Sequence, residues 1–230
     1  IKFLSHRALI LAVKANCLFI VKFLILTIAN VNYVGLGGET PLMTAVGQNN
    51  LEMVKYLVEK GANKPQIILI CAARQGNLEM VKYLVEKGAR INTSTVDHFE
   101  TALMHAAEKG HLAVVKYLVN TDNIMARNWY GYTALMFAAD KGHLAVVQYL
   151  VEQGSNIHST HTRRTYNALT CAISTNNSDI VKFLIFTGKC LNLIDCNYRY
   201  FSYYEFLSKN KTQVFLKKIK TLLESNLALE

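Results

Sequence analysis

One pattern of apolar residues recurs along this chain, and such a repeat constrains the fold more than any single motif does. The clearest copy runs from Asn128 to Gly154, where a turn, a short helical segment, a glycine, a longer helical segment and a second glycine follow in order. Leu144 begins the longer segment of this copy, and the equivalent residues of the other copies are Leu18, Leu51, Leu78, Leu112 and Ser178. Most of these positions are about 33 residues apart, so the sequence predicts an array of similar units.

Each longer segment has the periodicity of an amphipathic helix. In the run 52–57, Val54 and Leu57 fall on one helical face while Lys55 falls on the other. A shorter apolar segment with small alanines, such as residues 103–107, precedes most of these runs. Because one such helix pair cannot bury both of its apolar faces, the pairs must stack on one another.

The repeated unit resembles the ankyrin repeat family. The opening motif of that family, Thr-Pro-Leu-His-x-Ala-Ala, is similar to residues 40–46, 101–107 and 133–139, with Met in place of the family's His. The Gly-His pair between helices occurs at 110–111 and 142–143. The resemblance implies an all-α ankyrin-repeat solenoid of stacked helix-turn-helix units with short hairpin fingers. It also implies that His111 and His143 tie one turn to the next.

We expect one ankyrin-repeat domain over residues 1–230, with repeats at 5–34, 35–64, 65–95, 96–127, 128–160 and 161–192 and a degenerate C-terminal cap at 193–230. The interval between Leu51 and Leu78 is 27 residues, about six below the family period. The sequence therefore predicts a truncated finger around residues 63–66, as a local change rather than a break in the stack.

Cysteine usage and the N-terminal hydrophobicity bear on the compartment. Five cysteines without a C-x-x-C pair indicate neither a disulfide framework nor a zinc ribbon, and Cys17, Cys71 and Cys171 fall inside helical patterns. We expect an intracellular, reducing, cytoplasmic location. The closely similar copies at 52–60 and 79–87 resemble the large ankyrin families of viruses and intracellular microbes. For such a protein, the expected location includes the cytoplasm of a host cell. The apolar stretch 8–34 contains Lys14 and Lys22, so we expect a repeat unit and no membrane span.

No group of residues in the sequence supports catalysis. The seven histidines are scattered, and neither a phosphate-binding nor a dinucleotide-binding glycine motif is present. The H-x-x-H at 158–161 lacks neighbouring cysteine or carboxylate ligands. We therefore expect no enzyme activity, no cofactor and no metal, whereas the sequence gives no prediction of the oligomeric state.

The functional prediction rests on the positions whose residue type the repeat pattern does not specify. The resemblance implies that a partner binds the finger tips and the adjoining short-helix surface, which together form a concave face. Trp, Tyr and Arg, the types that dominate interface hot spots, are concentrated at two adjacent tips. The candidate partner-binding residues are Trp129, Tyr130, Tyr132, Arg163, Arg164, Tyr166, His98 and Glu100 at the tips, with Lys109, Asp140, Lys141 and Arg74 at the short helices. The alternative for the aromatic residues is that they pack tip against tip and stiffen the array.

These observations favour a non-catalytic scaffold for protein–protein binding. The net charge of +9 favours a partner with an acidic surface. A nucleic-acid-binding module ranks below this, because the lysines of the longer segments alternate with glutamates and no aromatic-and-basic stripe accompanies them. Because the chain does not begin with Met, we also expect that it could be the targeting arm of a larger enzyme or adaptor.

Overall fold

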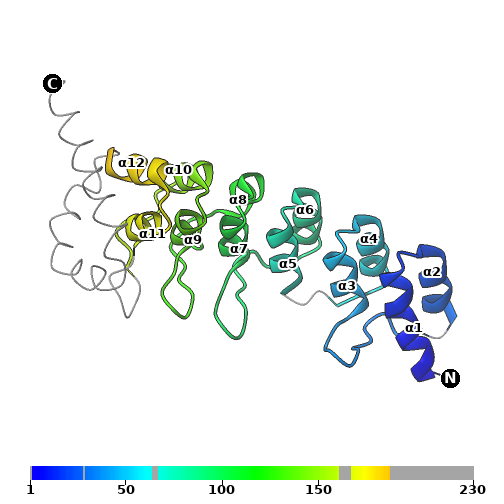
Figure 1. The fold of residues 1–230 in the computed structure, drawn as a ribbon. Helices are drawn as coiled ribbons and strands as arrows, with labels where there is room; N and C mark the ends of the chain where they lie inside the picture. Colours follow the sequence, from blue (N-terminus) through cyan, green and yellow to red (C-terminus); the bar gives the residue numbers. More distant parts are fainter. Residues whose placement is uncertain (1, 28, 64–66, 161–166, 187–230) are drawn as a thin grey trace, which may run out of the picture.

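The computed structural model describes residues 2–27, 29–63, 67–160 and 167–186, with the side chains of residues 2–5 excepted. These residues form a row of six helix pairs that runs from α1 and α2 at one end to α11 and α12 at the other (Figure 1). No strand occurs in these ranges, and an isolated bridge joins Ser94 to Thr101. The helices are α1 Lys2–Lys14, α2 Leu18–Thr27, α3 Pro41–Gly47, α4 Leu51–Glu59, α5 Ile67–Gln75, α6 Leu78–Glu86, α7 Ala102–Glu108, α8 Leu112–Leu118, α9 Ala134–Asp140, α10 Leu144–Glu152, α11 Ala168–Ser174 and α12 Ser178–Phe186.

The all-α solenoid predicted from the sequence is confirmed, and the second helix of every pair begins at the predicted residue. Local capping explains why the helices begin there. The Asn50 side chain accepts a hydrogen bond from the Met53 amide at 3.0 Å, and Asn77 does the same for Met80 at 2.9 Å. Such a cap satisfies a backbone donor that the first helical turn leaves without a partner. The proposed C-terminal cap, residues 193–230, lies outside the described residues.

The apolar faces of all twelve helices merge into one continuous core. Val54 and Leu57 are completely buried, as their helical periodicity predicts, and Lys55 is exposed. The short helices α5, α7, α9 and α11 pack side by side in one row, where Ala106 and Ala138 are fully buried. A side chain no larger than a methyl group lets neighbouring helix backbones approach closely, which explains the alanines of the repeated motif.

Hydrogen bonds between turns of successive units hold the stack in register. The Nε2 atom of His111 lies 3.0 Å from the carbonyl oxygen of Arg74, and Nε2 of His143 lies 2.9 Å from that of Glu108. The role predicted for these two histidines is therefore confirmed. Elsewhere a side-chain amide forms the equivalent bond between units: Gln75 Nε2 donates to the Gly47 carbonyl at 2.7 Å.

The short interval between Leu51 and Leu78 in the sequence corresponds to a short connection between α4 and α5 in the structure. Residues 60–66 separate α4 from α5, whereas residues 87–101 separate α6 from α7. The predicted truncated finger includes residues 64–66, which lie outside the described residues. Across this connection Asn77 Nδ2 donates to Asn49 Oδ1 at 2.6 Å, and α3 still packs against α5. These contacts support the prediction that the deletion is local.

The apolar N-terminal stretch forms a helix pair. α1 ends at Lys14 and α2 begins at Leu18, and within the described ranges no helix combines the length and hydrophobicity that a membrane crossing requires. Cys17 lies in the turn between these two helices, so the prediction that it falls inside a helix is wrong. The turn forms because Asn16 takes a positive φ of 53°, a conformation that asparagine tolerates better than most residues.

Candidate protein-binding surface

Two neighbouring fingers, residues 94–101 before α7 and residues 127–133 before α9, have hydrogen-bonded bases. In the first, the Thr95 amide donates to the Glu100 carbonyl at 2.9 Å. In the second, the buried Asn128 side chain accepts from the amides of Tyr130 and Tyr132 at 3.0 and 2.8 Å. An asparagine that bonds to the backbone two and four residues ahead fixes the turn, so the residues at its tip are held in place.

The tips of these fingers meet in an aromatic group, which we call the tip cluster: His98, Phe99, Trp129 and Tyr130. Trp129 stacks on Phe99 with 5.8 Å between ring centroids, and Tyr130 lies 5.7 Å from His98. The Trp129 amide donates to the His98 carbonyl at 2.8 Å, which joins the two fingers. Trp129 nevertheless keeps 66% of its surface exposed, and Tyr130 keeps 49%. The aromatic residues thus pack tip against tip and still present apolar surface to solvent.

Tyr132 has a different environment from the tip cluster. It is half-buried at the base of its finger, where its ring lies 5.4 Å from that of Phe137 and packs against the core. Part of this side chain therefore supports the finger. Arg163, Arg164 and Tyr166, predicted at the next finger, lie outside the described residues.

The charged candidates lie where the short helices end, beside the fingers. Lys109 Nζ is 3.4 Å from Glu108, and Lys141 Nζ is 2.9 Å from Asp140. Arg74 lies in the last turn of α5, so this surface carries both acidic and basic groups. Many of the basic residues behind the net charge of +9 lie outside the described residues: Lys64, Arg163, Arg164, Lys189, Arg199, Lys209, Lys211, Lys217, Lys218 and Lys220.

Glu100 connects the two fingers to the α7 helix. One carboxylate oxygen lies 3.2 Å from Nε2 of His105, and the other accepts from Asn128 Nδ2 at 3.3 Å. Glu100 could be singled out from the sequence, but His105, a partly buried residue between Met104 and Ala106 in α7, was not predicted. Burial is the main cause that lowers the pKa of His105, and Arg74 and Lys109 add to it; Glu100 and Glu108 oppose the shift.

Acidification is expected to destabilise the protein through His105. Because its pKa is lowered in the folded state, the unfolded chain, where the pKa is near 6.5, binds the proton more tightly. The His105 contribution is therefore fully present above that pKa and is lost as the pH falls through 6.5 toward the folded value. Urea unfolding at about pH 8 and about pH 5.5 measures this. The loss of unfolding free energy should be larger in the wild type than in His105→Asn, and equal losses would contradict it.

Two cysteines and one histidine motif are further groups of the chain that could react or bind a metal. Burial raises the pKa of Cys171 to about 12 and also raises that of Cys71, which disfavours the reactive thiolate. Within the described ranges, no group of three histidine, cysteine or acidic residues could hold a metal ion, and His161 of the H-x-x-H lies outside them. These positions therefore add no reactive centre to the candidate surface.

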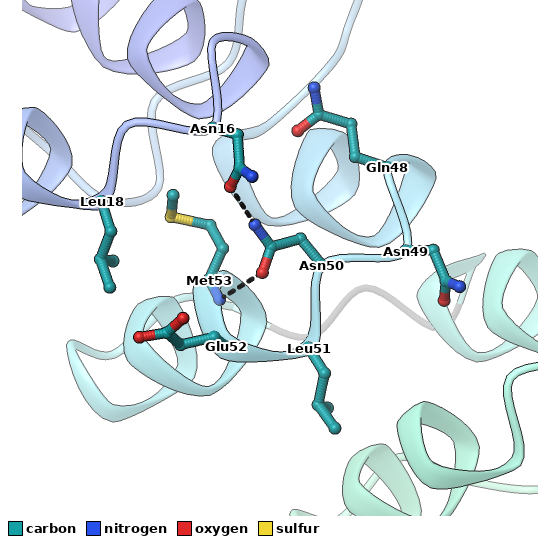
Figure 2. Close-up of a pocket in the computed structure, with 8 residues that line it drawn as sticks. All are labelled: Asn16, Leu18, Gln48, Asn49, Asn50, Leu51, Glu52 and Met53. Carbon is teal, nitrogen blue, oxygen red and sulfur yellow. Dashed lines mark hydrogen bonds between the residues drawn. The ribbon is translucent and has the colours of Figure 1, made fainter.

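One open hollow lies between the turns that join α1 to α2 and α3 to α4 (Figure 2). It has a volume of about 680 Å³, and its lining residues are Asn16, Leu18, Gln48, Asn49, Asn50, Leu51, Glu52 and Met53. Asn50 bonds to the Asn16 side chain and also caps α4 through the Met53 amide. The amide side chains that line this hollow already form hydrogen bonds that hold the two turns together. We therefore interpret the hollow as a structural feature of the stacked array.

A family model described as ankyrin repeats in three copies matches residues 9–95 and 69–161, which is more than half of the chain. A search of curated proteins found no match. The matched region contains both fingers of the tip cluster, the second part of α1 and the whole of helices α2 to α10. The chain belongs to the ankyrin repeat family.

Proposed function

We propose that this protein is a non-catalytic scaffold that binds a protein partner through the tip cluster and the adjoining concave face. Ankyrin repeats are generally protein–protein interaction modules. The proposal assigns direct contact to Trp129 and Tyr130, and contact at the rim to Lys109 and Lys141. Arg163, Arg164 and Tyr166 belong to the proposed surface from their places in the sequence alone.

The exposed tip cluster carries this proposal. Large aromatic side chains contribute most of the binding energy in many interfaces, and contiguous exposed apolar patches often mark such sites. The hydrogen bond between Trp129 and His98 orders the cluster before any partner arrives. A partner that binds a preformed surface loses less conformational entropy than one that must order its target, which favours affinity.

The surroundings of the tip cluster suggest the chemistry of the partner. Apolar or aromatic side chains suit the face of Trp129, while Glu108, Lys109, Asp140 and Lys141 offer paired charges that suit a polar segment of mixed charge. An acidic partner surface remains a prediction from the net charge of +9. Net charge acts mainly on the association rate, so salt would slow the binding of such a partner.

Affinity capture with the wild type and with Trp129→Ala/Tyr130→Ala, followed by mass spectrometry, tests the proposal. We expect the double substitution to weaken capture of the specific partner at least tenfold, because hot-spot truncations commonly cost about 2 kcal/mol or more. Thermal unfolding should change little, since Trp129 keeps 66% and Tyr130 keeps 49% of its surface exposed. A matched control is Val34→Ala/Leu36→Ala at the finger before α3, which also removes exposed apolar surface.

The outcomes of that experiment separate a role in binding from a role in packing. Loss of capture with an unchanged unfolding midpoint supports a direct role of the tip cluster. If the midpoint falls together with capture, the stack of Trp129 on Phe99 serves the fold instead. Equal capture by the wild type and the double variant would contradict the proposed surface.

A further inference from the structure

A chain of polar contacts links the short helix α7 to the tip cluster. It begins at His105, which is partly buried and whose Nε2 atom lies 3.2 Å from one carboxylate oxygen of Glu100. The other carboxylate oxygen accepts a hydrogen bond from Asn128 Nδ2 at 3.3 Å. Glu100 belongs to the finger before α7 and Asn128 to the finger before α9, so a single carboxylate joins α7 to both fingers.

Asn128 extends this chain of contacts to the tip of the second finger. Its side-chain oxygen accepts from the amides of Tyr130 and Tyr132, and Asn128 itself is buried. Trp129 follows Asn128 directly in the chain, between the residues that this side chain holds. A buried amide that loses its acceptor is costly, so a displacement of Glu100 disturbs Asn128 and, through it, the turn that carries Trp129.

Charges of both signs act on His105, and their effects oppose each other. The carboxylates of Glu100 and Glu108 lie 3.2 and 3.8 Å from its ring nitrogens, while Arg74 from α5 and Lys109 act in the opposite sense. The other charged or titratable groups on the helices packed against α7 are Cys71 on α5, Lys116 and Tyr117 on α8, and Asp140 and Lys141 at the end of α9. Burial is the main influence, and it lowers the pKa of His105.

The neutral imidazole therefore fits this site better than the imidazolium does. Proton binding favours the arrangement that holds the proton more tightly, which here is one in which water reaches the ring. Glu100 lies against Nε2, so hydration of that atom displaces the carboxylate. The displacement withdraws the acceptor from Asn128.

We propose that Glu100 and His105 are positioning residues of the tip cluster, and that protonation of His105 loosens this cluster and weakens partner binding. Neutral His105 and Glu100 hold Asn128 in place, and Asn128 holds the turn that carries Trp129. The consequence for binding rests on the function proposed above, whereas the change at the tip does not depend on any partner. A complex formed near neutral pH is therefore released on acidification.

Fluorescence tests the change at the tip without a partner, because Trp129 is the one tryptophan of the sequence. Acrylamide quenching is measured between about pH 8 and about pH 5.5, where histidines titrate. All proteins carry His98→Asn, which removes the imidazole of the tip cluster and keeps the backbone carbonyl that bonds to Trp129. We expect the quenching constant to rise on acidification, toward the increase of about 1.5-fold that complete exposure of a residue now 66% exposed would give.

Three variants in this background separate the steps. His105→Asn should abolish the rise, because asparagine does not titrate. Glu100→Gln keeps an acceptor for Asn128 but loses a charge that raises the pKa of His105, so the rise should move to lower pH. Glu100→Ala removes the acceptor, so the quenching constant should be high over the whole range.

Three results would overturn the proposed coupling. The first is a rise that persists unchanged in His105→Asn, and the second is a midpoint that Glu100→Gln does not move. The third is a loss of helical circular dichroism with the same midpoint as the rise, because the whole fold would then be opening rather than the tip.

Capture of the partner, with His98 intact, tests the consequence for binding. Capture by the wild type should be about fivefold weaker at about pH 5.5 than at about pH 8, which corresponds to one hydrogen bond of about 1 kcal/mol. His105→Asn should lose this dependence, which separates it from titration of the partner. If capture needs Trp129 and Tyr130 while quenching ignores pH, the coupling is wrong and the proposed function stands. If quenching responds but capture does not need the tips, the function is wrong and the coupling stands.

Discussion

Replacing Leu57 by Ala is expected to lower the free energy of unfolding by about 2–5 kcal/mol, the range typical of a leucine truncated in a close-packed core. Leu57 has no exposed surface and lies in α4, inside the continuous core. Alanine would remove the transfer free energy of the lost carbon atoms and leave a cavity that neighbouring helices can fill only in part. Urea unfolding followed by circular dichroism measures this loss.

The control for this change is Leu144→Ala. Leu144 begins α10 and belongs to the repeated pattern, but it is only partly buried. We therefore expect a loss of less than about 2 kcal/mol, because less apolar area returns to water. Equal losses at the two positions would contradict the burial seen in the structure. The m-value should be checked as well, because long repeat arrays can lose two-state cooperativity.

Gly110→Ala is the second change with a large expected effect. Gly110 has a φ of +74°, and a β-carbon at this position would lie 2.5 Å from Nδ1 of His143. The substitution combines backbone strain with displacement of the imidazole that bonds to the Glu108 carbonyl. We expect a loss of about 2–4 kcal/mol, from left-handed strain of about 1–2 kcal/mol and an impaired hydrogen bond of about 1 kcal/mol with the clash added.

Gly88→Ala separates the two causes. Gly88 has a similar φ of +92°, but no atom lies within 4 Å of an added β-carbon. This variant should therefore show only the strain of about 1–2 kcal/mol. Adding His143→Ala to Gly110→Ala should recover part of the loss by removing the clashing ring, which a double-mutant cycle in chemical denaturation can resolve. If Gly88→Ala and Gly110→Ala are equally costly, the contact with His143 does not matter.

The helices and their stacking could be predicted because their causes are local and repeated. Leu51 and Leu78 mark helix starts since an asparagine cap precedes each, and the apolar spacing that follows specifies one buried face. The inter-turn role of His143 could be predicted from the repeated Gly-His pair. Cys17 was misplaced because a turn that uses Asn16 at positive φ has no glycine to mark it.

The candidate surface was predicted only as a set of positions. Trp129 was named from its residue type, but its stacking partner Phe99 was not, because that contact joins two fingers about 30 residues apart in sequence. His105 was not predicted for a different reason, since its contact with Glu100 depends on how the finger before α7 folds back on that helix. The contact of Trp129 with Phe99 is not encoded by the spacing within one repeat, because it joins two units.

The sequence by itself determined the all-α repeat architecture, the helix starts and the residues that fill the core, because hydrophobic periodicity and capping act within a single unit. The tertiary structure decided which side chains remain exposed after stacking. Only the assembled array places Trp129 on Phe99 with most of its surface in solvent, and leaves Ile20 uncovered while Met53 is buried. The physical reason is that the burial of a side chain depends on the neighbouring units. Equivalent residues in units of similar sequence can therefore be buried to different extents.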